Sequence, residues 1–311
     1  VKLGSDCSLG FTRPARGYRI RNIVGDTNCN LFQIGSETAD DIQDVYVDNI
    51  YVLGANKAGF SISTNDGGHV KNVYLNSGKT GPLHSRSKMR RTRTPFFISI
   101  SNRGRVLGAE VKPFTFKENG VVRKELLVTN VNIGRVENVV INGVDIEEVY
   151  GGSSFRAGRW KPYDGSQNVS SPIIAGFKLP DTENVEGGLT FVLPDGRHTG
   201  YIENVCFRDV NLLVKGGHSL EDRNACPPEI GVGRYNVGDL KVQPAFGFWM
   251  RHVKGIVLDA CRIETEQPDG RYAVVLDDVQ GAVVKGLKVD ATLPESQWIH
   301  VTGGSKNVVI E

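Results

Sequence analysis

The stretch Asn138-Val139-Val140-Ile141-Asn142-Gly143-Val144 carries the pattern that decides the fold, with apolar residues at the first, third and sixth positions after an asparagine. Full or shortened copies of this pattern begin at Tyr18, Val45, Val73, Val205, Ile256, Ala282 and Val308. Four of the seven steps between successive copies lie within two residues of 27. A repeated period of this length indicates a solenoid, in which each repeat stacks on the next.

A second short apolar strand precedes the pattern in most periods. Its copies are Phe32-Gln33-Ile34, Phe60-Ser61-Ile62, Ile98-Ser99-Ile100, Phe248-Trp249-Met250, Val274-Val275-Leu276 and Ile299-His300-Val301. Two or three short strands in each period of about 27 residues predict an all-β fold, a right-handed parallel β-helix with a continuous buried interior. The length predicts about ten or eleven coils in a single domain of residues 1–311. Asn72, Asn138, Asn204 and Asn307 each precede a valine, which favours structural turns with stacked amides.

The composition agrees with many short strands and excludes several other classes of protein. Glycine accounts for 37 of 311 residues, the net charge is +2, and 39% of the residues are hydrophobic, so neither a disordered chain nor a generic polyanion binder is predicted. No apolar run approaches a membrane span, and the cysteines lack metal-ligand spacing, so no membrane span, metal or cofactor is predicted. The chain begins at Val1 without a methionine, and its first residues already have the pattern of a strand, so we expect N-terminal coils to be missing.

Four segments interrupt the period and are predicted to be loop insertions: residues 79–94, 103–125, 151–171 and 215–244. Long loops on a rigid stack commonly determine specificity. The first insertion is cationic and includes Arg86, Lys88, Arg90, Arg91 and Arg93. These side chains could bind sugar carboxylates, or they could form a solvated loop; nucleic acid is disfavoured because no aromatic residues interleave the run.

One outward face of the stack is predicted to be a polar groove. The alignment that gives it places Val1–Asp6, Phe32–Glu37, Phe60–Asn65 and Ile98–Arg103 on one another. Because side chains alternate along a strand, small and polar side chains then point outward and form a polar strip. The strip ends in a column of Asp6, Glu37, Asn65 and Arg103. Such a strip suits an extended polar chain, and a polysaccharide is the predicted partner.

The groove predicts paired carboxylates for acid and base catalysis. Asp6 and Glu37 are the first candidates and Asp66 is a reserve, because inverting glycosidases hold two carboxyl groups roughly 6.5–9.5 Å apart. Alternatively, Asp6 and Glu37 only end strands as solvated turn residues. The residues predicted to bind substrate are Gln33, Ser61, Ser63, Asn65, His69, Arg86, Arg103 and Trp249. His69 could instead be a structural turn residue, and Trp249 a partly buried strand aromatic.

Several of these runs resemble the polygalacturonase superfamily, meaning glycoside hydrolase family 28 and related bacterial β-helix proteins. The resemblance rests on residues 32–37, Pro95–Arg105, Ala245–Gly255 and Ala273–Val279, and it spans nearly the whole chain. It implies a parallel β-helix that hydrolyses pectin-like cell-wall or other acidic polysaccharides, by inversion and with paired aspartates. In that family an aspartate pair precedes the strand that Val1–Asp6 resembles.

The chain departs from the family at two motifs. The family's Gly-His-Gly falls on Asn28-Cys29-Asn30, and its Arg-x-Lys falls on Ser61-Ile62-Ser63, which suggests a different sugar specificity or different carboxylates. The leading hypothesis is therefore a polygalacturonase-like glycoside hydrolase, secreted or periplasmic. A polysaccharide lyase and a non-catalytic carbohydrate-binding β-helix are the alternatives.

Overall fold

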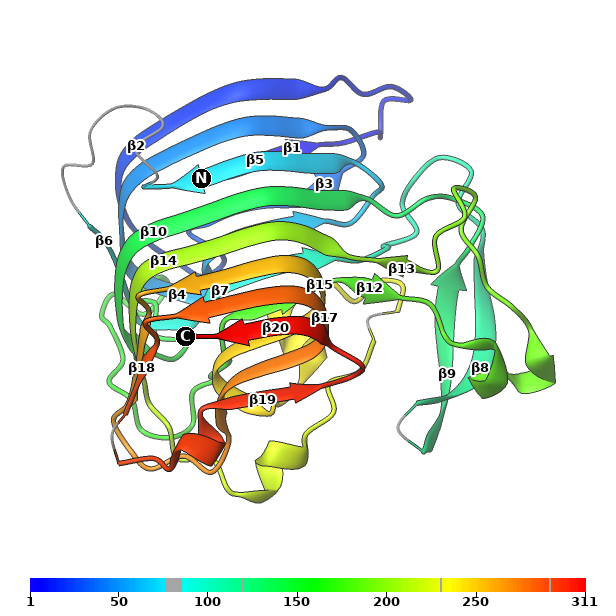
Figure 1. Ribbon diagram of the computed structural model, residues 1–311. Coiled ribbons are helices and arrows are strands. Elements are labelled where there is room, and N and C mark those ends of the chain that lie inside the picture. Colours follow the sequence, from blue (N-terminus) through cyan, green and yellow to red (C-terminus); the bar gives the residue numbers. More distant parts are fainter. Residues whose placement is uncertain (77–85, 119, 230, 291) are drawn as a thin grey trace.

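A computed structural model describes residues 1–76, 86–118, 120–229, 231–290 and 292–311. The fold is all-β, with 55% of residues in strands and 6% in helices, and one large sheet of 16 strands dominates it. All pairings between strands of this sheet are parallel. The coils stack from the N-terminal strands to the C-terminal ones (Figure 1), so the predicted parallel β-helix is confirmed.

The outer sheet contains the repeated pattern of the sequence. Its strands are β2 (Ala15–Thr27), β4 (Ile42–Thr64), β5 (His69–Leu75), β10 (Arg135–Val149), β14 (Ile202–Val214), β15 (Ala245–Asp259), β17 (Tyr272–Lys285) and β20 (Lys306–Ile310). Val45 pairs with Val73, Val73 with Val139, and Val139 with Val205, so the apolar positions predicted to stack do so. These side chains are buried, which explains why the alternating pattern recurs in each coil.

The same 16-stranded sheet bends around the coils, and we call its two other faces the groove sheet and the third sheet. The groove sheet contains β1 (Lys2–Ser5), β3 (Phe32–Thr38), the end of β4, β7 (Thr92–Ile100), β11 (Ile173–Ala175), the starts of β15 and β17, and β19 (Ile299–Thr302). The third sheet contains β6 (Ser87–Arg90), β16 (Arg262–Thr265) and β18 (Lys288–Val289), paired with later parts of β4, β10 and β14.

Two of the asparagines that precede the repeat, Asn72 and Asn138, form a structural ladder of the kind predicted. Asn72 and Asn138 have φ values of 57° and 58°, in the left-handed region that asparagine tolerates. The Asn138 amide donates to Asn72 Oδ1 at 2.6 Å, and the Asn72 amide donates to Asp44 Oδ1 at 2.8 Å. Stacked amides therefore fix the same bend in successive coils.

The number of coils is smaller than the length suggests. Within the described residues, the outer sheet contains the eight strands named above, one for each coil, and not ten or eleven. The number is smaller because the insertions add residues without adding coils. The insertion predicted at 79–94 is partly regular, since β6 and the start of β7 lie within it, while its first residues fall outside the described part of the chain. The segment 103–125 includes β8 (Val111–Glu118) and the start of β9 (Val121–Val128), an antiparallel hairpin that projects from the stack (Figure 1).

The groove alignment predicted from the sequence is wrong by two residues at β7. Ser61 pairs with Phe97 and Ser63 with Ser99, so Ser61 does not face Ser99. A two-residue slip preserves the alternation of inward and outward side chains, and the apolar pattern therefore cannot detect it. An irregular step between Leu3 and Ser5 likewise pairs Ser5 with Thr38, which removes Asp6 from the column of Glu37.

Short elements complete the insertions. They are β12 (Phe177–Lys178) and β13 (Thr199–Gly200), which pair with each other, and the 3-10 helices η1 (Thr182–Asn184), η2 (Glu186–Gly188), η3 (Glu221–Asn224), η4 (Val237–Leu240) and η5 (Glu295–Gln297).

Candidate functional site

Two recesses are associated with the outward face of the groove sheet. The N-terminal recess has a volume of about 200 Å³ and lies over β1, β3 and the end of β4. The C-terminal recess has a volume of about 1000 Å³ and lies over the starts of β15 and β17 and over β19. The larger recess is also lined by residues of β8, of the 178–184 segment and of the 215–244 insertion.

A segment that we name the strap separates the two recesses. It consists of residues 225–229 and 231–244, and it crosses the groove sheet over β7 and β11. Val237 and Leu240 of η4 belong to one apolar cluster with Phe97, Ile173 and Trp249 of the sheet. The strap therefore explains why outward positions in the middle of the groove are apolar, whereas the sequence predicted a polar strip across the first four coils.

The N-terminal recess brings together four of the residues predicted to bind substrate. Gln33, Ser61, Ser63 and Asn65 line it beside Lys2. Asn65 already uses its side chain within the protein, because its amide donates to Ser36 O and its oxygen accepts from Ser101. The remaining floor is polar and small, and Lys57 adds a second cation to the lining.

The carboxylates predicted beside this recess are occupied by ion pairs. Arg103 donates from Nε and Nη2 to the two Asp66 oxygens at 2.9 and 2.6 Å, and Asp66 also accepts from the Thr38 amide at 3.0 Å. Asp66 and Arg103 are 4% and 5% exposed, so this pair is buried. The arrangement indicates a structural role for Asp66 and leaves it no open side for substrate.

Glu37 is held in its ionised form. Burial alone would raise the pKa of Glu37, but the bond from Lys2 and the charges of Lys2 and Arg103 lower it to about 2. A carboxyl with this pKa cannot keep the proton that a general acid must deliver. Asp6 is exposed and accepts a hydrogen bond from the Ser8 amide at 2.9 Å.

Three other predicted residues lie away from the N-terminal recess. His69 begins β5 on the outer sheet, with its ring 3.2 Å from Glu137. Arg86 binds Asp145 and Asp209 at the edge of β10 and β14, so it does not lie above the groove. Trp249 lines the C-terminal recess, but it is fully buried, because it packs with Val237 and Leu240 of the strap and Arg251 lies 4.8 Å over its ring.

The C-terminal recess takes its polar groups from two adjacent coils. Arg251 and His252 lie on β15, and their register neighbours Asp277 and Asp278 lie on β17, one coil further along. His252 and Asp278 both have positive φ, 55° and 51°, at the bend between the groove sheet and the outer sheet. That bend projects the two side chains to the same side, so they can meet.

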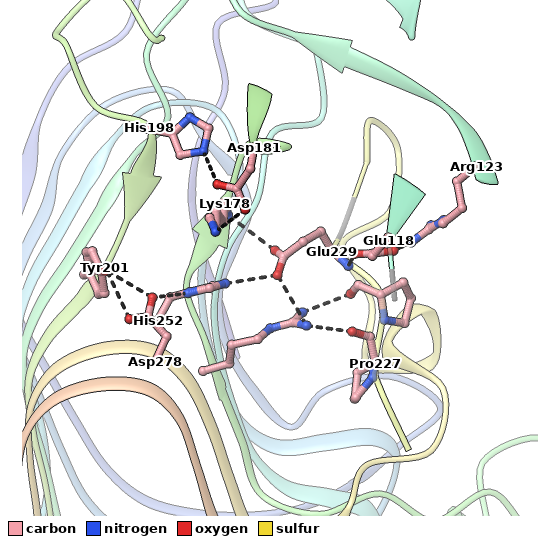
Figure 2. A network of polar contacts seen from close by, with 12 residues as sticks. Glu118, Arg123, Lys178, Asp181, His198, Tyr201, Pro227, Glu229, His252 and Asp278 are labelled. Atoms are coloured by element: carbon pink, nitrogen blue, oxygen red, sulfur yellow. Dashed lines mark hydrogen bonds and ion pairs between the residues drawn. The ribbon is translucent and has the colours of Figure 1, made fainter. Parts of the chain in front are cut away.

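His252 joins two carboxylates that come from different elements. Its Nδ1 lies 2.7 Å from Asp278 Oδ2, and its Nε2 lies 3.0 Å from Glu229 Oε1 of the strap. Figure 2 shows this chain of contacts, with the Tyr201 hydroxyl donating to Asp278 at 3.0 Å from the far side. Burial and the bond to Asp278 raise the pKa of Tyr201 to about 12, so it remains a hydrogen-bond donor.

These contacts fix the charges of the network. Burial would lower the pKa of His252, but the Glu229 charge and the bonds to Asp278 and Glu229 raise it to about 9. Burial would raise the pKa of Glu229, but Arg251 and His252 lower it to about 2. Near neutral pH, therefore, His252 is an imidazolium between two carboxylates.

Asp277 has the opposite character. Burial raises its pKa, and the nearby charges of Arg251 and His252 only partly oppose this effect. Among the described residues, none donates a hydrogen bond to its carboxyl group. Gly303 has φ of 64° and lies against Asp277, where a Cβ would come within 2.0 Å of Asp277 Oδ1. A carboxyl whose pKa is raised by burial thus lines the same cavity as the ionised Glu229.

Cations complete the recess. Arg251 donates to the carbonyls of Pro227 and Pro228 at 2.6 and 2.9 Å and contacts Glu229 at 3.3 Å, while its buried Nε has no hydrogen-bond partner within the described residues. Arg223 stacks over Tyr272 at 4.7 Å and forms no ion pair within the same part of the chain. Lys178 pairs with Asp181 at the rim, and His198 lies 3.2 Å from Asp181 (Figure 2).

Part of this site could be predicted from the sequence. The dipeptides Arg251-His252 and Asp277-Asp278 are 26 residues apart, one coil, so their stacking follows from the repeat. Nothing in the sequence places Glu229, which comes from an insertion and meets His252 only through the tertiary path of the strap.

No protein-family model matches the chain, and no curated protein matches it. Within the described residues, no helix is long and apolar enough to cross a membrane, and no group of three His, Cys, Asp or Glu side chains is arranged to hold a metal ion.

Proposed function

We propose that the chain is a glycoside hydrolase of the polygalacturonase-like class, which cleaves an acidic polysaccharide in the C-terminal recess. One observation carries this proposal: Asp277, whose pKa is raised by burial, lines the same cavity as the ionised carboxylate of Glu229. Glycosidases need two carboxyl groups in these opposite states, one to protonate the leaving oxygen and one to act on the other side of the sugar.

The environment assigns a role to each carboxyl group. Asp277 is assigned as the general acid, because burial raises its pKa, whereas the pKa of Glu229 is lowered. Glu229 is the general base that accepts a proton from the attacking water, which gives inversion. Its low pKa makes it a weak base, and the positive charges of His252 and Arg251 that cause this also hold it in place.

Acidic sugars are the proposed substrates because cations line the recess. Arg223 has no carboxylate partner within the described residues, and Arg251 has an unpaired Nε. Arginine binds carboxylates through two parallel hydrogen bonds, so Arg223, whose only hydrogen bond within the described residues is from Nε to the Gly270 carbonyl, is suited to a uronate. Polygalacturonate is the first substrate to test.

Asp277→Asn and Glu37→Gln together test which recess carries the chemistry. In reducing-end assays on polygalacturonate and other acidic polysaccharides, we expect D277N to lose roughly 100-fold or more of the rate, the usual contribution of a general acid. We expect E37Q to keep most of it, because Glu37 pairs with Lys2 and Arg103 and cannot supply a proton. The exposed Asp164→Asn is the matched control.

The folding of D277N is checked by thermal unfolding. Its Tm should equal or exceed that of the parent, because the substitution removes a carboxyl group whose charged form is disfavoured by burial. Loss of activity in E37Q with full activity in D277N would move the catalytic site to the N-terminal recess. A product that absorbs in the near ultraviolet would indicate a lyase, and binding without turnover would indicate a carbohydrate-binding protein.

A further inference from the structure

The strap crosses the groove sheet and interrupts the path that a polymer could follow along it. A polysaccharide that followed the outward face would cross successive coils, which are about 4.8 Å apart in a parallel sheet. Between the two recesses its path meets η4, whose Val237 and Leu240 pack in one cluster with Phe97 and Ile173. The sheet surface there is covered by protein and offers no continuous channel.

The strap is fixed near its start and in its middle. Near the C-terminal recess, Arg251 binds the Pro227 and Pro228 carbonyls, and the Glu229 amide donates to Glu118 at 2.7 Å. Near the N-terminal recess, Lys57 donates to Asn236 at 2.8 Å, and Arg103 stacks over Tyr235 at 5.4 Å.

Its last residues are fixed as well. Gln243 is 1% exposed, and its side-chain oxygen accepts from the Ser171 amide at 3.2 Å, while its carbonyl accepts from Arg271 at 3.4 Å. A segment with buried apolar side chains and bonds along its length opens rarely, so it behaves as a wall and not as a lid.

Other walls enclose the larger recess. Phe116, Lys117 and Glu118 of β8 line it together with Lys178 to Asp181, and Arg223 to Cys226 line it as well. The residues of the last coil that line it are His300, Thr302 and Gly303. A chain in this recess can therefore extend past the last coil or outward to solvent, but it must stop at the strap.

We infer that the C-terminal recess accepts the end of an acidic polysaccharide chain and releases short units from it, so that the enzyme is exo-acting. This inference rests on the proposed function, and it adds that internal bonds of a long chain do not reach Asp277 and Glu229. The N-terminal recess lies beyond the wall and does not continue the same binding path.

The first experiment uses the unmodified protein. Polygalacturonate and size-defined oligogalacturonides are incubated with it, and viscosity, reducing ends and product sizes are followed together. Exo action predicts one short product from the start, with reducing ends released while the viscosity hardly changes. A ladder of intermediate sizes with an early fall in viscosity would overturn the inference and leave the proposed hydrolase in place. Absence of turnover on every acidic polymer tested would remove both.

The second experiment loosens the wall. The double variant Val237→Ala/Leu240→Ala removes apolar contacts of η4 with the sheet, and we expect the share of intermediate-sized products to rise at least several-fold. Leu220→Ala, a change of an exposed side chain in the same insertion, is the matched control and should leave the product pattern unchanged. Thermal unfolding confirms that the double variant is folded; a folded variant with an unchanged single product would contradict the role of the strap.

Discussion

His252 is the residue on which the charge balance of the C-terminal recess depends. Its side chain is 6% exposed and lies between Glu229 and Asp278, so no cation would stand between these two carboxylates if His252 were neutral. The same contacts that raise the pKa of His252 to about 9 keep Glu229 ionised. His252 is therefore a positioning residue in the proposed mechanism, because it acts through Glu229.

The stability of the protein should depend on pH through this histidine. The pKa of His252 in the folded protein, about 9, lies above the ordinary histidine value of 6.5, so the stabilising contribution is complete below pH 6.5 and is lost as the pH rises toward 9. Glu229 behaves in the opposite way, since its pKa of about 2 gives a contribution that is lost as the pH falls below 4.5. We expect Tm to fall between pH 6.5 and 9 in the parent protein.

His252→Gln tests the origin of that pH dependence. The variant should lose about 3 kcal/mol of unfolding free energy at pH 6, the lower end of the range for a broken buried ion pair, because Glu229 keeps Arg251 as a partner. Its Tm should also vary less between pH 6.5 and 9. His300→Gln, a change of a half-buried histidine on β19, is the control and should retain the parent's pH dependence. An unchanged pH profile in H252Q would contradict the assignment.

At the scale of elements, an ion-pair chain ties the first four strands of the groove sheet together. Lys2 of β1 binds Glu37 of β3, Glu37 contacts Arg103 after β7, and Arg103 binds Asp66 after β4. The chain therefore links successive coils at this edge of the groove sheet. Its carboxylates are therefore structural neighbours of the N-terminal recess.

Arg103→Leu should show how strongly this chain holds the coils. Removing the guanidinium leaves Asp66 buried and charged, and we expect a loss of roughly 3–5 kcal/mol in urea unfolding. The double variant Arg103→Leu/Asp66→Asn should recover part of that loss, because the uncompensated charge is gone. Arg105→Leu, at an exposed position two residues away, should change stability by no more than about 0.5 kcal/mol. Equal losses in the single and double variants would argue against a charge effect.

The elements also show how far the sequence could predict this fold. The columns through Val45, Val73 and Val139 were predictable, because each coil repeats the same alternation and the buried interior enforces it. The register of β7 was not predictable, because a shift of two residues leaves the apolar side chains pointing inward and the others outward. The Asp66–Arg103 pair and the position of Glu229 were also out of reach, since both depend on how insertions and strand ends meet in space.

At the scale of the whole molecule, the apolar interior of the coils stabilises the fold. This stability allows charged groups to be buried on the groove sheet, although their burial lowers the free energy of unfolding. Phe207 lies in the middle of this interior, fully buried, with ring centroids 5.3 Å from Phe96 and 4.9 Å from Phe248. It reaches from the outer sheet to two strands of the groove sheet. Stability therefore comes mainly from inside the coil, while Asp277 on the outside works against it.

Phe207→Ala should separate these two contributions. We expect a loss of about 3–5 kcal/mol of unfolding free energy, because the substitution leaves a cavity between two sheets. The activity per folded molecule should stay near that of the parent well below the new Tm, because Phe207 does not line the C-terminal recess. The exposed Phe155→Ala is the control for loss of an aromatic ring. D277N should give the reverse result, with stability kept or increased and turnover lost. If F207A lost activity while still fully folded, the recess would depend on core packing more closely than its position outside the coil indicates.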